Sequence, residues 1–268
     1  MPMINAKKRV KRAYKPRARK PRVSSVPLAI KQYVNRAIHV DQENKTMTVN
    51  YAGLFGNSTA NPSLYSYPIT PYTGYLTIPQ GVGQNQRIGN EIKIRKVFLR
   101  YVLRPQGYNV DNNPFPAPCQ IDMYLGRTRI CPGDQPIAAD FNNLFQSGSA
   151  SLAPVGSLND LVSNPNTDYF TIKKRWSHKL GYANYQGTGA INANQYFANN
   201  DFKLNVVKKL DITKLCPKTL KFNDTLNTVQ GPGLFFWYQA VNAGGGVNGS
   251  TVLPAHITFW IDIQYEDA

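Results

Sequence analysis

The sequence has few of the residues that build metal centres and disulfide frameworks. Its 268 residues include only three cysteines and three histidines. Cys119, Cys131 and Cys216 form no CxxC motif and would leave one thiol over if two paired, so we expect free thiols in a reducing compartment. The histidines show no HxH, HExxH or mixed Cys/His ligand spacing. The sequence therefore predicts no metal and no cofactor.

The motifs of common enzymes are also missing. The sequence contains no GxSxG and no GxxxxGK[ST], and the glycines of "GVGQNQRIG" do not match GxGxxG. Ser177 and His178 are adjacent, so on a strand they would point to opposite faces and could not act as a nucleophile and its base. We therefore expect a protein that is not an enzyme.

Long apolar runs are absent as well. No segment approaches the roughly 18 apolar residues that a membrane-spanning helix requires. The basic N-terminal segment has no apolar segment behind it, so we do not expect a secretory signal. The sequence predicts no membrane partner.

Acidic residues are absent from the first 40 positions, which hold twelve Lys and Arg. Ten of these lie in residues 7–22, "KKRVKRAYKPRARKPR". The formal net charge of the chain is +16, and the positions after residue 40 carry nineteen bases against fifteen acids, a balance of only +4. A like-charged block repels itself and buries little apolar area. We therefore predict a basic arm over residues 1–40 that is disordered until it meets a partner.

Such an arm is typical of polyanion binding, and nucleic acid is the leading candidate. Lys and Arg neutralise phosphates and release counterions, which makes binding independent of sequence and sensitive to salt. "KKRVKR" would serve equally as a nuclear localisation signal, and a solubilising tail without a partner is the remaining alternative. The predicted nucleic-acid-binding residues are Lys7, Lys8, Arg9, Lys11, Arg12, Lys15, Arg17, Arg19, Lys20, Arg22, Lys31 and Arg36.

The rest of the chain, residues 41–268, shows the alternation of β-strands. In "HITFWIDIQYE" (256–266), five apolar residues face one side and Thr258, Trp260 and Asp262 face the other. The phase of the apolar residues slips within 90–105, which predicts a β-bulge near Arg95 and Lys96. Eight such segments, separated by loops rich in Gly and Pro, predict an all-β antiparallel sandwich or jelly roll.

Helical signal is confined to two short segments. The apolar spacing after Pro27 predicts one amphipathic helix over 28–40, with a plain linker as the alternative. "AADFNNLFQ" (138–146) is the second candidate. Two long connections, 56–87 and 128–167, are aromatic or proline-rich, so we expect them to be ordered against neighbouring subunits.

A second basic cluster lies in "YFTIKKRWSHKL" (169–180). Strict alternation would direct Phe170, Ile172, Trp176 and Leu180 inward. Lys173, Arg175 and Lys179 would then share the opposite face as an inner-surface patch for nucleic acid, or as an ordinary solvated face.

These features together resemble the capsid proteins of small icosahedral viruses, above all the circovirus-like capsids of small circular Rep-encoding single-stranded DNA viruses (CRESS-DNA viruses). The resemblance rests on "KKRVKRAYKPRARKPR", on "RIGNEIKIRKVFLRYVL" (87–103) and on "AHITFWIDIQYED" (255–267). The second of these is similar to the Arg-x-Gly segment that leads into the second jelly-roll strand. Coat proteins of small and satellite RNA viruses share the plan, so the type of nucleic acid rests on analogy.

The resemblance implies a single eight-stranded antiparallel jelly roll with two four-stranded sheets. Its strands would be B 46–55, C 90–104, D 119–127, E 168–180, F 201–212, G 218–223, H 233–241 and I 255–265. The long connections would become the B–C and D–E loops. About sixty copies would form a virion shell with the arms inward around single-stranded DNA, assembled in the host nucleus with the help of the import machinery. A cellular nucleic-acid-binding module with a basic tail is the rival interpretation.

Overall fold

The computed structural model describes most of the chain after residue 43. The described residues are 27, 29–31, 33, 44–57, 65–70, 77–107, 118–129, 140–181, 204–222, 229–230, 233–242 and 252–267. The chain divides into two units, Met1–Gln42 and Glu43–Ala268. In the first unit, Ala29, Ile30, Lys31 and Tyr33 are helical, and the amides of Ile30 and Lys31 donate to the Pro27 carbonyl. The predicted start of a helix at Pro27 is confirmed, whereas the rest of 28–40 lies outside the described residues.

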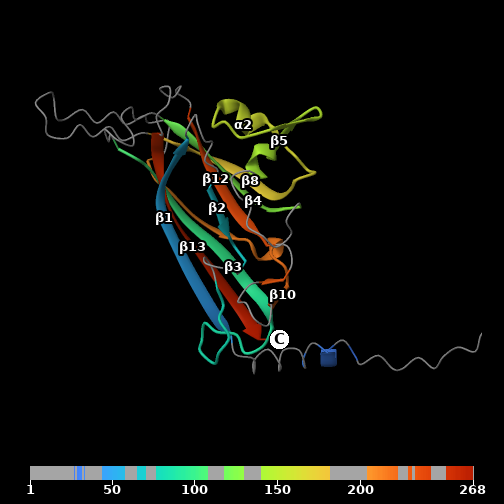
Figure 1. Ribbon diagram of the computed structural model, residues 1–268. Helices are drawn as coiled ribbons and strands as arrows, with labels where there is room; N and C mark the ends of the chain where they lie inside the picture. Colours follow the sequence, from blue (N-terminus) through green and yellow to red (C-terminus); the bar gives the residue numbers. More distant parts are fainter. Residues whose placement is uncertain are drawn as a thin grey trace, which may run out of the picture. The chain divides into compact units, whose positions relative to one another are not determined.

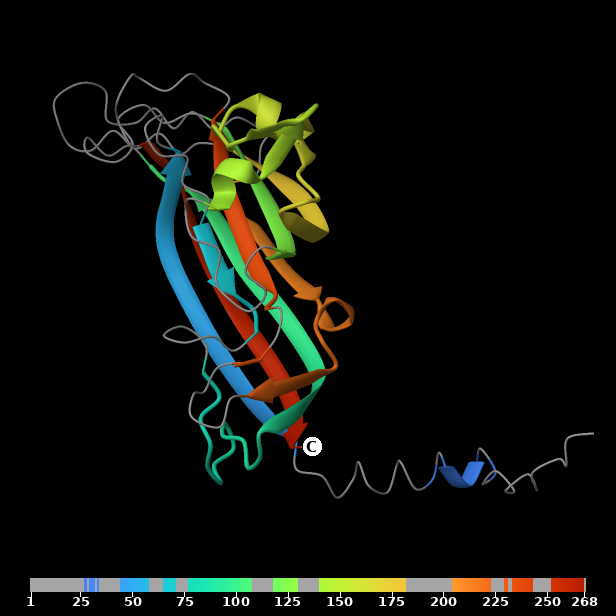
Figure 2. The same ribbon diagram turned by 45° about the vertical axis from the view of Figure 1, so that its right-hand side comes forward.

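The second unit is a sandwich of two antiparallel sheets (Figures 1 and 2). The first sheet contains β1 (Lys45–Asn57), β13 (Val252–Asp267), β3 (Glu91–Pro105), β10 (Thr219–Phe222) and β11 (Val229–Gln230) in that order, and β9 (Val206–Asp211) also pairs with β3. The second sheet contains β2 (Tyr65–Pro68), β12 (Phe235–Asn242), β4 (Cys119–Thr128) and β8 (Phe170–Leu180) in that order.

β9 and β10 lie end to end along the same edge of β3. β9 pairs with residues 98–103 and β10 with residues 91–93, with the short 3₁₀ helix η2 (Thr213–Leu215) between them. Together they act as one interrupted strand. The sheets then read B-I-D-G and C-H-E-F in the usual letters, which is the strand order of a jelly roll. The predicted fold class is confirmed.

The strand letters expected from the sequence are wrong from C to F, whereas B, H and I are confirmed. Strand C is β2, a four-residue strand "YSYP" inside the connection 56–87. The segments expected as C, D and E are therefore D, E and F, and the segments expected as F and G are the two parts of G. The long connection 128–167 belongs to the E–F loop rather than a D–E loop, and the Arg-x-Gly segment precedes the third strand rather than the second.

The central core fills the space between the sheets. Ile257, Phe259, Ile261, Ile263 and Tyr265 of β13 are all buried, as the alternation predicts. The register between β13 and β3 shifts where Gln264 pairs with Lys96 and Tyr265 with Ile94, which leaves Arg95 as the extra residue. The predicted bulge near Arg95 and Lys96 is confirmed.

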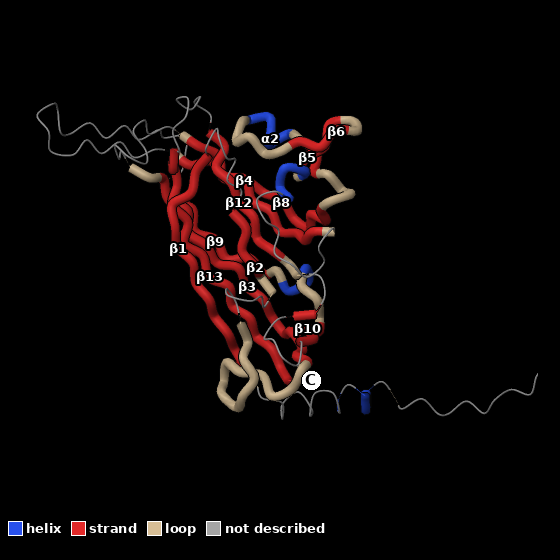
Figure 3. Tube along the Cα trace, in the orientation of Figure 1, coloured by secondary structure: helices blue, strands red, loops and turns tan. Residues whose placement is uncertain are grey.

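The E–F loop forms a small layer over the outer face of the second sheet (Figure 3). It contains η1 (Asp140–Asn143), β5 (Phe145–Ser147), β6 (Ala150–Leu152), α2 (Leu158–Val162) and β7 (Asn164–Pro165). A second apolar cluster joins it to the sheet and includes Tyr124, Phe145, Phe170 and Trp237. The helix expected over 138–146 is thus wrong in extent, because residues 145–147 pair as a strand. The described helices include none that could cross a membrane.

Candidate nucleic-acid interface

The basic arm lies almost entirely outside the described residues. This holds for Lys7, Lys8, Arg9, Lys11, Arg12, Lys15, Arg17, Arg19, Lys20, Arg22 and Arg36. Lys31 is described, and its side chain is exposed on a helical turn. The assignment of the arm to nucleic acid therefore stays a prediction.

The second predicted cluster lies on β8, and a bulge divides it. Leu125 pairs with Lys174 and Gly126 with Ile172, so Lys173 is an extra residue that interrupts the alternation. Phe170 and Ile172 consequently pack in the second apolar cluster, whereas Trp176 and Leu180 belong to the central core. The prediction that Phe170, Ile172, Trp176 and Leu180 share one face is wrong.

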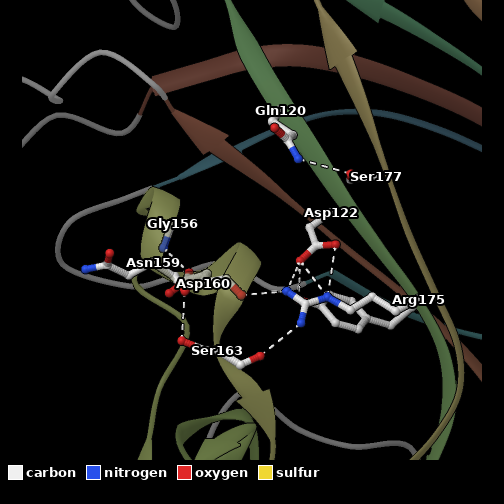
Figure 4. A network of polar contacts seen from close by, with 9 residues as sticks. Gln120, Asp122, Gly156, Asn159, Asp160, Ser163, Arg175 and Ser177 are labelled. Atoms are coloured by element: carbon white, nitrogen blue, oxygen red, sulfur yellow. Dashed lines mark hydrogen bonds and ion pairs between the residues drawn. The ribbon is translucent and has the colours of Figure 1, made fainter.

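Arg175 is engaged by acids and carbonyls of its own chain (Figure 4). Its Nη2 lies 2.7 Å from Asp122 Oδ2 and donates to the Asp160 carbonyl, while its Nη1 donates to the Ser163 carbonyl at 3.0 Å. The guanidinium also lies over the Tyr124 ring, 5.0 Å from its centroid. Arg175 thus ties α2 to the second sheet and does not add a free charge to a patch.

The acidic side chains of this network, Asp122 and Asp160, are buried. Asp122 is 1% exposed and also accepts a short hydrogen bond from the Tyr124 hydroxyl. Burial acts to lower the pKa of Arg175, but the hydrogen bond to Asp122 and the nearby negative groups raise it above its ordinary value. Burial raises the pKa of Asp160, although amide donors, including that of Gly156 at 2.6 Å, oppose the rise.

Lys173 and Lys179 remain exposed, but they lie in different surroundings. Lys179 pairs across the sheet with Gln120, near the end of β8, and its side chain is exposed. Lys173 lines a hollow of about 370 Å³ together with Arg127, Cys216 and Leu234. The structure therefore does not bring Lys173, Arg175 and Lys179 together as one cationic surface.

The serine and histidine of β8 point to opposite faces, as expected. Ser177 accepts a hydrogen bond from Gln120 at 3.0 Å on the outer face, whereas His178 Nε2 lies 2.7 Å from the Tyr101 hydroxyl inside the sandwich. Trp176 Nε1 donates to the same hydroxyl at 2.9 Å, and burial raises the pKa of Tyr101 to about 12. The hydrogen-bonded side chains of Tyr101, Trp176 and His178 therefore have a structural role between the two sheets. Within the part of the chain that the structure describes, no group of three or more His, Cys, Asp or Glu could hold a metal ion.

The Arg-x-Gly segment has a structural role. Arg87 is 1% exposed, and its Nη1 donates to the Gly89 carbonyl and to Asn90 Oδ1, the latter at 2.9 Å. Its guanidinium lies 4.4 Å from the centroid of the Phe222 ring. These contacts shape the turn that leads into β3, so Arg87 is not available to a phosphate.

Sequence reasoning missed a cationic and aromatic surface on the first sheet. Arg100, Lys209 and Trp260 lie side by side on three neighbouring strands. Two signals could have found it. Trp260 stands on the polar side of the alternation in 256–266, and Lys209 stands on the side of its strand opposite the apolar Val206 and Leu210.

The sequence matches no protein-family model, and it matches no curated protein. Solved structures similar to this chain include one from Desmodium yellow mottle tymovirus, at 9% identity and a TM-score of 0.33, over 84% of this chain and 88% of that one. One from turnip yellow mosaic virus has 6% identity and a TM-score of 0.35, over 85% of this chain and 84% of that one. A 60-mer BFDV capsid protein has 9% identity and a TM-score of 0.18, over 84% and 94% of the chains. The function proposed below rests on this chain's own residues and topology.

Proposed function

We propose that this chain is a viral capsid protein that assembles into a small icosahedral shell and packages single-stranded nucleic acid through its basic arm. The division of charge carries the proposal. Twelve bases and no acid occupy residues 1–40, whereas the jelly-roll body after them has a balance of only +4. A free polyanion-binding arm attached to a nearly neutral β-sandwich suits a protein that gathers many copies around one nucleic acid.

The arithmetic of assembly agrees with this function. About sixty arms of twelve charges each would place roughly 720 positive charges inside one shell, enough to offset a large share of a small genome's phosphates. The low charge of the body lets subunits meet without strong repulsion, because large single-sign charge opposes association.

The finer parts of the proposal follow the resemblance described above. Circular single-stranded DNA is the leading genome type, and the arm would also act as a nuclear localisation signal for assembly in the host nucleus. The protein would have a structural role and no catalytic one. A coat protein of a small or satellite RNA virus would have the same arm and body and would differ in the nucleic acid recovered from its particles.

Deletion of residues 1–25 tests the role of the arm. We expect the truncated protein to keep the far-ultraviolet circular dichroism of a β-sandwich, because the described sandwich begins at Lys45. We expect nuclease-protected nucleic acid in the purified protein to fall to the background level. Protection equal to that of the full chain would contradict the assignment of the arm.

A further inference from the structure

The outer face of the first sheet carries two cross-strand rows of unusual composition. Residues directly opposite each other on paired strands project to the same face. One row is Trp260 of β13, Arg100 of β3 and Lys209 of β9, and the next is Thr258, Val102 and Val207 of the same strands. We call Arg100, Val102, Val207, Lys209 and Trp260 the Trp260 face. Lys208 pairs with the buried Tyr101, so its side chain leaves β9 on the opposite face.

The Trp260 face is hollowed. A depression of about 270 Å³ is lined by all five of its residues and by Tyr101 and Lys208. Its wall is apolar, because Trp260 and two valines contribute to it, and its rim carries cations. Val207 is 70% exposed, which is costly for a valine on an edge strand unless something covers it.

The cations around the hollow are held in different ways. Arg100 is fixed by Asp262, with Nη2 2.8 Å from Oδ1 and Nε 2.6 Å from Oδ2, and its guanidinium lies 5.9 Å from the centroid of a Trp260 ring. Lys209 Nζ lies 4.3 Å from the centroid of Phe98. Among the described residues, Lys208 and Lys209 form no ion pair, so their charges are available to an anion.

We propose that the Trp260 face binds single-stranded nucleic acid, with an unpaired base packed against Trp260 in the hollow and a phosphate beside Lys209. Proteins that hold single strands combine cations along the backbone with aromatic side chains on which bases stack. Duplex nucleic acid keeps its bases paired and would not offer one to the hollow. The inference rests on the proposed packaging function and adds a second contact to it, on the folded body instead of the arm.

The charge of Lys209 favours nucleic acid over a second copy of this chain as the occupant. The centre of a protein–protein interface is depleted in charged residues, and Lys is depleted across such interfaces. Here Lys209, which has no ionic partner in the described chain, borders the apolar wall itself, and this suits a ligand that brings both an apolar ring and a phosphate.

Site-specific photocrosslinking of the full-length protein tests the proposal. The probe is a short oligodeoxythymidine carrying 5-iododeoxyuridine, and crosslinked peptides are identified by mass spectrometry. We expect crosslinks at the peptide that contains Trp260, in addition to those at the arm. A tenfold excess over probe of unlabelled single strand should lower the Trp260 crosslink yield about tenfold, and the same excess of duplex should leave it unchanged.

Two double variants supply a matched comparison. K208Q/K209Q removes the two charges at the hollow, and K214Q/K218Q removes two exposed charges from the same stretch of chain away from it. We expect the first to lower the crosslink yield at Trp260 about fivefold or more, and the second to change it less than twofold. Both variants should keep the wild-type thermal midpoint, because all four side chains are exposed.

Three results would overturn the inference. Crosslinks confined to the arm would place all binding there and leave the proposed function standing. Equal crosslink yields in the two double variants would show that the lysines lining the hollow make no contact. Protection of the Trp260 peptide from hydroxyl radicals in shells free of nucleic acid would make this face a subunit contact. A protein that gave no crosslinks and no particles would instead contradict the proposed function itself.

Discussion

The guanidinium of Arg175 lies between two layers of the molecule, with the second sheet on one side and α2 on the other. From the sequence it looks like a solvated base on a strand, equivalent to Lys173 and Lys179. The structure separates the three because Asp122, on the neighbouring strand, and the carbonyls of Asp160 and Ser163 converge on Arg175 alone. No local pattern in the sequence predicts this contact, because Asp122 lies 53 positions away from Arg175 along the chain.

Replacing Arg175 by Met should destabilise the fold by about 3 kcal/mol or more, because Asp122 would remain as an uncompensated buried charge. Chemical denaturation of the full chain measures the change. The double variant R175M/D122N should lose much less than the sum of the two single changes, because the members of a pair are coupled. A strong loss of nucleic-acid binding by R175M at unchanged stability would contradict the internal role and support the patch.

Asp160 gives this network a dependence on pH. Its pKa in the folded state is raised above the ordinary 3.8, chiefly by burial, so the folded state binds the proton more tightly than the unfolded state. The contribution of Asp160 to stability is therefore present below the ordinary pKa and is lost as pH rises through the folded pKa. We expect the difference in unfolding free energy between wild type and D160N to decrease over this window. A difference that is flat or rises with pH would contradict the burial of Asp160.

At the scale of the element, the long strands could be predicted and the short or interrupted ones could not. The strands 91–105 and 252–267 alternate along most of their length between buried and less buried residues, and even the bulge at Arg95 is visible as a phase slip. β2 has only four residues and ends at Pro68. Its position is set by pairing with β12, where Tyr65 meets Tyr238, and that partner lies far away in the sequence.

The bulge in β8 shows a second limit. A bulge is visible in a sequence when the apolar residues on both sides of it belong to one buried face, so that their alternation shifts by one position, as it does around Arg95. In β8, both phases bury apolar residues, because Phe170 meets the E–F layer and Trp176 meets the central core. In a strand that is covered on both faces, a change of register therefore leaves no visible break in the sequence pattern.

The E–F layer leaves apolar side chains exposed, which we expect another subunit to cover. Leu158 and Val162 of α2 are 53% and 80% exposed. V162E should lower the yield of assembled particles several-fold while the thermal midpoint of the subunit stays unchanged, because burying an unpaired carboxylate in a contact is costly. S149E, which adds the same charge to an exposed turn of the same layer, is the control. Equal yields from V162E and wild type would exclude this helix from the contacts.

At the scale of the whole molecule, the excess positive charge and the apolar core lie in different parts of the sequence. The arm holds the excess charge and the body holds two apolar clusters and a sandwich of B-I-D-G and C-H-E-F order. The fold class could be predicted from the period of the apolar residues, whereas the role of the basic arm stays a prediction from composition. The binding surfaces of the body could not be predicted from the sequence. They depend on which residues of distant strands lie opposite one another, as Trp260, Arg100 and Lys209 do.

Particle formation tests the central claim most directly. The full-length chain is expressed, separated by size-exclusion chromatography and viewed by negative-stain electron microscopy, with the salt concentration and added single-stranded DNA varied. The account predicts closed, uniform, small icosahedral shells that elute far ahead of a 30.0 kDa monomer. A protein that stays monomeric or dimeric under all these conditions would contradict it.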